Sequence, residues 1–162
     1  MFSKEGIRVL HREAHSCLDI VFGHAARLPF SVVAQELSGV SHGSARNQMV
    51  HVLFTEAGWV GDLQNKPVAQ WRNEDFRDLS SLTEAKRRVA AETAKYLDSL
   101  TETELNTPIT RKPTEWVGPP RSPAFILLHI VTHVFHHKGQ MAMMFRLLGY
   151  PMGDTDLQRE SA

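Results

Sequence analysis

The sequence predicts an all-α protein, a four-helix bundle with a long crossover between the second and third helices and a small loop or hairpin before the last helix. Three observations predict this class. Four long segments carry apolar residues at spacings of three and four, no segment shows the alternation of a central strand, and no repeat exceeds the helical period. With 162 residues the chain fits one domain, so we expect a single bundle over residues 1–162.

The first two helices are predicted from their apolar stripes. The first runs from residue 4 to about residue 28, where Pro29 interrupts the pattern. The second runs over residues 44–60, and Ser41 or Ser44 is available to cap its free amides. Glycines near residue 60 are expected to weaken its end.

A long crossover is predicted between the second and third helices. Residues 61–80 show no sustained period and no tight turn, so they permit the two helices to run parallel. Ser81 followed by Glu84 resembles a capping box at the start of the third helix, whose stripe continues to Leu100. A further short helical turn is expected near Thr101.

Four prolines between residues 106 and 121 predict a loop or short edge hairpin, with a small strand pair around Ile109 and Trp116. The last helix follows and is the clearest element. Ser122 supplies an N-cap and Pro123 suits the first helical position. Gly149 and Pro151 end this helix after about seven turns.

Composition excludes several classes of protein. Eighteen basic side chains balance eighteen acidic ones, so no overall charge attracts nucleic acid or an anionic membrane. The apolar stretch 124–131 is too short to span a membrane, and the N-terminus shows no signal peptide. Cys17 is the only cysteine, which excludes an internal disulfide and suits a reducing compartment. We therefore expect a cytoplasmic protein.

Histidine is the unusual residue, because four of the nine lie between positions 129 and 137. His129, His133 and His137 are spaced four apart, so successive side chains are offset by only ~40° around a helix. Imidazoles one turn apart can converge on one metal ion, and His133 with His137 forms such a pair. A third ligand must come from another helix. His51 is the natural candidate, although the wheel places it beside polar residues, and four further histidines remain open alternatives: His11, His15, His24 and His42.

The histidine stripe of the last helix is expected to face the bundle interior. Its arc also contains Ile126, Gln140, Met144 and Leu147, which are mostly apolar.

Two motifs resemble the DinB/YfiT-like family of bacterial four-helix-bundle proteins. The first is the stretch HIVTHVFHHKGQ over residues 129–140, and it is followed by Arg146, Gly149, Pro151 and Asp156. The second lies on the second helix, where the family has a histidine, an acidic residue five positions on and a tryptophan eight positions on. His51, Glu56 and Trp59 match this spacing. The resemblance covers roughly residues 5–157.

The resemblance implies that His51, His133 and His137 are the protein ligands of one divalent metal ion, with water completing the shell. Imidazole ligands are compatible with several metals, of which we expect Zn or Ni. His129 and His136 are not implied as ligands, whereas Gln140 would lie close enough to bond a ligand. Glu56 is about 140° around the helix from His51 and is not expected to reach the metal.

Characterised relatives imply a thiol-dependent transferase, isomerase or hydrolase that activates a low-molecular-weight thiol at the metal and acts on a small-molecule substrate. The alternative is a non-catalytic, metal-stabilised and stress-associated bundle. The family also implies a homodimer, and the apolar circumference of residues 124–148 agrees with self-association. The catalytic residues and the substrate are not predicted.

Overall fold

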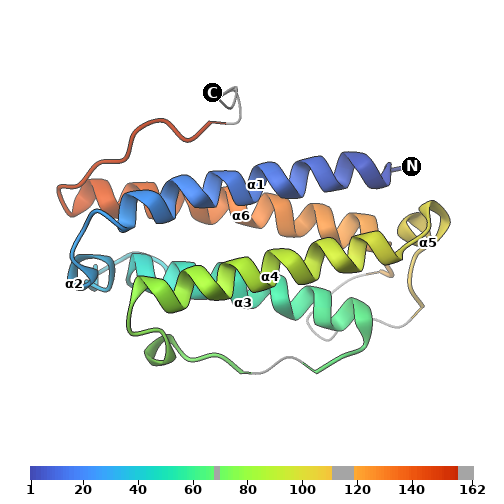
Figure 1. Ribbon diagram of the computed structural model, residues 1–162, viewed down its shortest axis with the longest axis horizontal. Helices are drawn as coiled ribbons and strands as arrows, with labels where there is room; N and C mark the ends of the chain where they lie inside the picture. The colour runs from blue at the N-terminus through green and yellow to red at the C-terminus, as the bar shows by residue number, and fades with distance from the viewer. Residues whose placement is uncertain (68–69, 111–118, 157–162) are drawn as a thin grey trace.

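Four long helices form a bundle in the computed structural model, which describes residues 1–67, 70–110 and 119–156 (Figure 1). The helices are α1 (Lys4–Ala25), α3 (Ala45–Gln64), α4 (Leu79–Ser99) and α6 (Pro123–Leu147). α1 packs against α4 and α6, and α3 packs against the same two helices, so the four enclose one interior. The described residues contain no strand, which confirms the predicted all-α class.

α3 and α4 run in the same direction, and α1 and α6 run opposite to them (Figure 1). The connection from α3 to α4 therefore returns along the length of the bundle. It carries a short 3-10 helix, η1 (Asn73–Asp75), and Trp71 and Phe76 pack against each other on either side of it. The predicted crossover with parallel second and third helices is confirmed.

The crossover is shorter than predicted, because α3 continues to Gln64 rather than ending near Val60. Gly58 and Gly61 lie inside the helix, and Gly61 is buried, so packing outweighs the low helix propensity of glycine. The helix closes instead at Asn65, whose left-handed backbone (φ 55°) suits a C-cap.

Helix starts follow local capping chemistry. Ser44 caps α3 by accepting a hydrogen bond from the Asn47 amide, and Ser122 caps α6, as predicted. The predicted N-cap of α4, Ser81, is wrong by three residues, because Asp78 is the cap and accepts from the Ser81 amide at 2.8 Å. α4 therefore begins three residues earlier than predicted, and Asp78 satisfies one of the first amides of the helix, which have no partner within it.

Two short helices complete the fold. α5 (Glu102–Asn106) begins with a capping box between Thr101 and Glu104, which confirms the expected turn. α2 (Phe30–Val33) has only four residues and was not predicted. In the segment before α6, the Ile109 amide donates a hydrogen bond to the carbonyl of Arg121 at 3.2 Å. Trp116, the other residue of the predicted strand pair, lies outside the described residues.

α6 contributes buried side chains to both apolar clusters of the core, including Ile130 and Phe145. Its histidine stripe lies at the edge of this core rather than inside it. Ile126 and Met144 are buried as expected, but Leu147 at the end of the stripe is 59% exposed. Among the described residues, no helix is both long and apolar enough to cross a lipid bilayer.

Candidate metal centre

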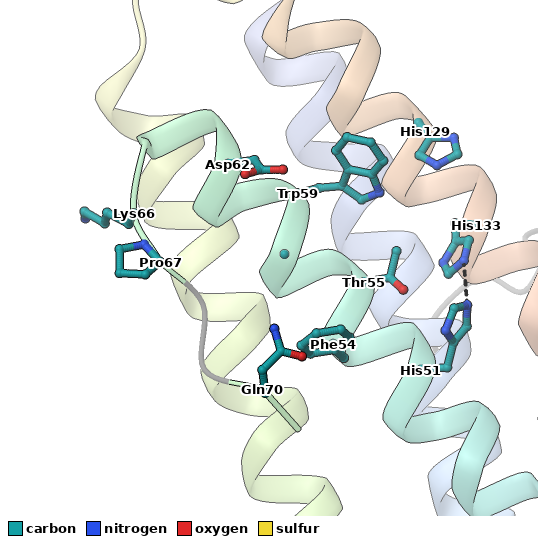
Figure 2. Close-up of a pocket in the computed structure, with 11 residues that line it drawn as sticks. His51, Phe54, Thr55, Trp59, Asp62, Lys66, Pro67, Gln70, His129 and His133 are labelled. Atoms are coloured by element: carbon teal, nitrogen blue, oxygen red, sulfur yellow. Dashed lines mark hydrogen bonds between the residues drawn. The ribbon is translucent and has the colours of Figure 1, made fainter. Parts of the chain in front are cut away.

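Three histidine side chains from two helices meet between α3 and α6. His51 lies on α3, and His133 and His137 lie one turn apart on α6. His133 Nε2 is 3.2 Å from His51 Nε2 and 3.0 Å from His137 Nε2, and Figure 2 shows the first of these contacts. The structure thus brings together the three residues that the family resemblance implies as ligands.

The spacing of these nitrogens fits a metal ion. Two imidazole nitrogens bound to one tetrahedral ion at 2.0–2.1 Å lie about 3.3 Å apart. The observed separations of 3.2 and 3.0 Å are close to this value. Small movements of the rings would therefore be enough to accommodate an ion.

Gln48 fixes which nitrogen of His137 carries the proton. The Gln48 amide nitrogen donates to the Ser41 carbonyl at 2.8 Å, and a carbonyl only accepts, so this contact sets the orientation of the amide. Gln48 Oε1 therefore faces His137 Nδ1 at 2.5 Å, and that ring nitrogen must donate. His137 Nε2 is left with a free lone pair toward His133, as a metal ligand requires.

Gln140 and His136 extend this network. Gln140 Oε1 accepts from the Gln48 amide at 2.9 Å, and the Gln140 amide donates to His136 Nε2 at 3.0 Å. Gln140 thus supports the residue that orients His137. His136 is exposed and lies at the outer end of this hydrogen-bond network.

The environment keeps the three imidazoles neutral. Burial lowers the pKa of His51 to about 4, with smaller contributions from His42 and His137. Burial likewise lowers the pKa of His133 to about 3 and that of His137 to about 4. Neighbouring imidazoles add to both effects, and a hydrogen bond with Gln140 partly opposes the shift in the pKa of His137. At neutral pH all three side chains therefore keep a lone pair available for a metal.

These pKa shifts predict a loss of stability in mild acid. A histidine whose pKa is lower in the folded than in the unfolded state favours folding above its unfolded pKa of about 6.5, and the advantage disappears as the pH falls toward its folded pKa. We expect the urea midpoint of the metal-free protein to fall between about pH 7 and pH 5. His133→Asn should show a smaller fall over this interval. A midpoint that is equal at both pH values would contradict the assignment of buried neutral imidazoles.

A pocket of about 700 Å³ opens beside His51 and His133. One wall is α3 and another is α6, and the start of the α3–α4 connection closes the rim (Figure 2). Apolar rings and polar groups both face it, so it suits a small molecule with both characters. Its lining is His51, Phe54, Thr55, Gly58, Trp59, Asp62, Lys66, Pro67, Gln70, His129 and His133.

The remaining histidines fall into distinct places. His42, one of the open alternatives, stacks on His51 with ring centroids 3.9 Å apart. His24 donates a hydrogen bond to the Tyr150 carbonyl. His129 lines the pocket, and the centroid of its ring is 6.0 Å from that of the His133 ring. His11 and His15 form part of a second, fully buried cluster around Glu56.

Glu56 is 1% exposed and accepts three hydrogen bonds. His11 and His15 approach its two oxygens at 2.7 and 2.9 Å, and the Thr93 hydroxyl donates at 2.6 Å. Burial acts to raise the pKa of Glu56, but the hydrogen bonds from both histidines outweigh it and hold the pKa well below its usual value. The network joins α1, α3 and α4 around one ionised carboxylate.

The Glu56 cluster also offers three metal donors within 4.8 Å of one another, but its proton arrangement favours hydrogen bonding. A carboxylate only accepts, so Nε2 of each histidine carries a proton. A metal bound there would move the proton to Nδ1, and His15 Nδ1 is buried without a partner among the described residues. The position of Glu56 away from the predicted ligands agrees with its 140° offset from His51.

Sequence reasoning missed Gln48 and the Glu56 network. His11 and His15 have the same four-residue spacing as His133 and His137, and this was the available signal for a second cluster. For Gln48, the signal was an amide one turn before His51. Cys17 is buried, and burial raises the pKa of its thiol.

The fold and this centre define a class of helical bundle in which histidines from two helices converge beside a pocket. The chain belongs to the DinB family, whose model matches residues 1–162. It is also similar to a solved structure described as a conserved protein from Enterococcus faecalis, with 16% identity and a TM-score of 0.70 over 91% of this chain and 98% of that chain. At this identity the likeness concerns the fold alone. No curated protein matches the chain.

Proposed function

We propose that this chain binds one divalent metal ion, Zn²⁺ or Ni²⁺, through His51, His133 and His137 and serves as a thiol-dependent S-transferase or hydrolase. One observation carries the proposal. His133 Nε2 lies 3.2 Å from His51 Nε2 and 3.0 Å from His137 Nε2, and the rings of His51 and His133 line the pocket of about 700 Å³. A substrate in the pocket would therefore lie next to the ion.

The residues of the chain suit this role. Gln48 holds His137 in the tautomer that can bind a metal, and burial keeps the three imidazoles neutral. Trp59 and Phe54 offer apolar surface to a small molecule, and Lys66 brings a cation to the rim. A metal ion held by three histidines supplies Lewis acidity and lowers the pKa of a bound thiol or water.

A metal titration tests this proposal. Protein stripped by a chelator should take up one equivalent of Zn²⁺ or Ni²⁺ and unfold at a higher temperature when loaded. The Co²⁺-loaded protein should then develop a thiolate-to-metal absorption band when a low-molecular-weight thiol is added. Failure to bind a metal rejects the whole proposal. Metal binding without any thiol band favours the alternative, a non-catalytic bundle in which the ion ties α3 to α6.

The role of Gln48 can be measured separately. Gln48→Leu keeps a buried side chain of similar size but removes the acceptor that orients His137. We expect metal affinity to fall about 10- to 100-fold in a competition titration with a chromophoric chelator. Gln140→Leu is the matched control and should lose less affinity, since Gln140 supports Gln48 and does not set the tautomer of His137. Equal affinities for Gln48→Leu and the wild type would contradict the orienting role.

We further propose that the chain forms a homodimer through the exposed apolar side chains of α6. Phe125, Met143 and Leu147 are 37%, 55% and 59% exposed. Sedimentation equilibrium at micromolar concentration should give twice the monomer mass of 18.3 kDa. Leu147→Glu should shift the equilibrium toward the monomer. A wild-type protein that sediments as a monomer contradicts this proposal.

A further inference from the structure

His42 lies on a turn beside the three proposed ligands and has an unusual backbone. Its φ is 60°, in the left-handed region that residues with a side chain rarely adopt, and Gly43 next to it has φ 75°. Such conformations are retained where the surrounding structure holds them, often at functional sites.

Hydrogen bonds hold this turn to α3. The His42 carbonyl accepts from the Ser44 amide at 2.9 Å and from the Asn47 side chain at 2.8 Å. The carbonyl of Ser41 accepts from Gln48, the residue that also orients His137. The turn and the proposed metal centre therefore share one set of supports.

The side chain of His42 faces the centre while remaining accessible. Its ring stacks on His51 with centroids 3.9 Å apart and planes 25° apart, and its centroid is 5.8 Å from that of His137. Nitrogens of His42, His51 and His137 lie within 4.8 Å of one another. His42 is nevertheless exposed, and its imidazole makes no hydrogen bond to another described residue.

We propose that His42 is a fourth, displaceable ligand that completes the metal shell at rest and leaves when a thiol binds. This inference rests on the proposed function. The three other donors lie on helices and are partly or fully buried, whereas His42 lies on an exposed turn, so its side chain can rotate away without a change in the fold. In the exchange, one metal–nitrogen bond breaks and one metal–sulfur bond forms. The neutral imidazole is released, and the thiol proton passes to solvent.

The test variant is His42→Asn, because asparagine tolerates the left-handed backbone and removes the imidazole. The metal-free variant should unfold at the same temperature as the wild type. Its Co²⁺ affinity should fall about tenfold, by the loss of one ligand. In the Co²⁺-loaded variant, the 2-mercaptoethanol concentration for half-maximal thiolate absorption should fall about tenfold, since no imidazole competes.

The control is His136→Asn, which removes another exposed histidine from the same region and should match the wild type in both titrations. If His42→Asn matches the wild type while both bind Co²⁺ and thiol, the fourth-ligand inference is wrong and the proposed function stands. If neither protein binds Co²⁺, both proposals fail. Equal shifts in His42→Asn and His136→Asn would also overturn the inference, because the effect would not be specific to His42.

Discussion

Replacing His133 or His137 with alanine is expected to abolish stoichiometric metal binding. His133 Nε2 lies within 3.2 Å of both other proposed donors, so its loss removes the central member of the set. Two imidazoles are too few for tight binding, and the affinity should fall more than about 100-fold. Metal content measured by mass spectrometry after dialysis against a chelator checks this prediction.

His136→Ala is the matched control, since it removes the histidine next to His137 on the exposed side of α6. The His136 ring touches the edge of the His137 ring but is not one of the proposed donors, so the metal content of His136→Ala should remain close to that of the wild type. His51→Ala should behave like the two α6 variants. Retention of one equivalent of metal by the His133 and His137 variants would show that the site is elsewhere.

Replacing Glu56 with alanine is expected to lower the free energy of unfolding by about 3–5 kcal/mol. The side chain is 1% exposed and serves as the acceptor for His11, His15 and Thr93. Its removal leaves these donors buried without a partner, and each unsatisfied buried donor lowers the free energy of unfolding. Urea unfolding of the metal-free protein at neutral pH measures the change.

Two milder variants separate the carboxylate from its neighbours. Thr93→Val removes one donor with little change in shape and should cost about 1 kcal/mol. Glu56→Gln keeps an acceptor oxygen but places an amide donor against a ring nitrogen. The free energy of unfolding lost in Glu56→Gln should therefore lie between the losses in Thr93→Val and Glu56→Ala. If Glu56→Ala costs less than about 1 kcal/mol, the network does not hold the three helices together.

The elements that depend on local chemistry could be predicted from the sequence. Ser122 and Pro123 specify the start of α6 without reference to the rest of the fold, and the missing turn after α3 specifies a crossover. The start of α4 was predicted wrongly at Ser81, because Asp78 is an equally good N-cap residue three positions earlier and is the one that the backbone uses. α2 is too short to produce a periodic pattern.

The histidine cluster between α3 and α6 was predictable only in part. His133 and His137 share a face of one helix, so their spacing alone brings them together. His51 required the family resemblance, since its neighbours on the helical wheel are polar. Two of those neighbours, Ser44 and Asn47, are in fact buried, because they satisfy the backbone at the start of α3. The location of His42 depends on one left-handed residue and on tertiary contacts, which periodicity does not report.

Part of the pocket rim lies outside the two helices that carry the proposed ligands. The proposed ligands all belong to α3 and α6, whereas Lys66, Pro67 and Gln70 at the pocket rim belong to the connection that lets α3 and α4 run parallel. Loops accept substitutions and insertions at small cost in stability, while the packed helices do not. Substitutions in this stretch of the connection could therefore reshape the pocket rim while the proposed ligands and the core stay unchanged.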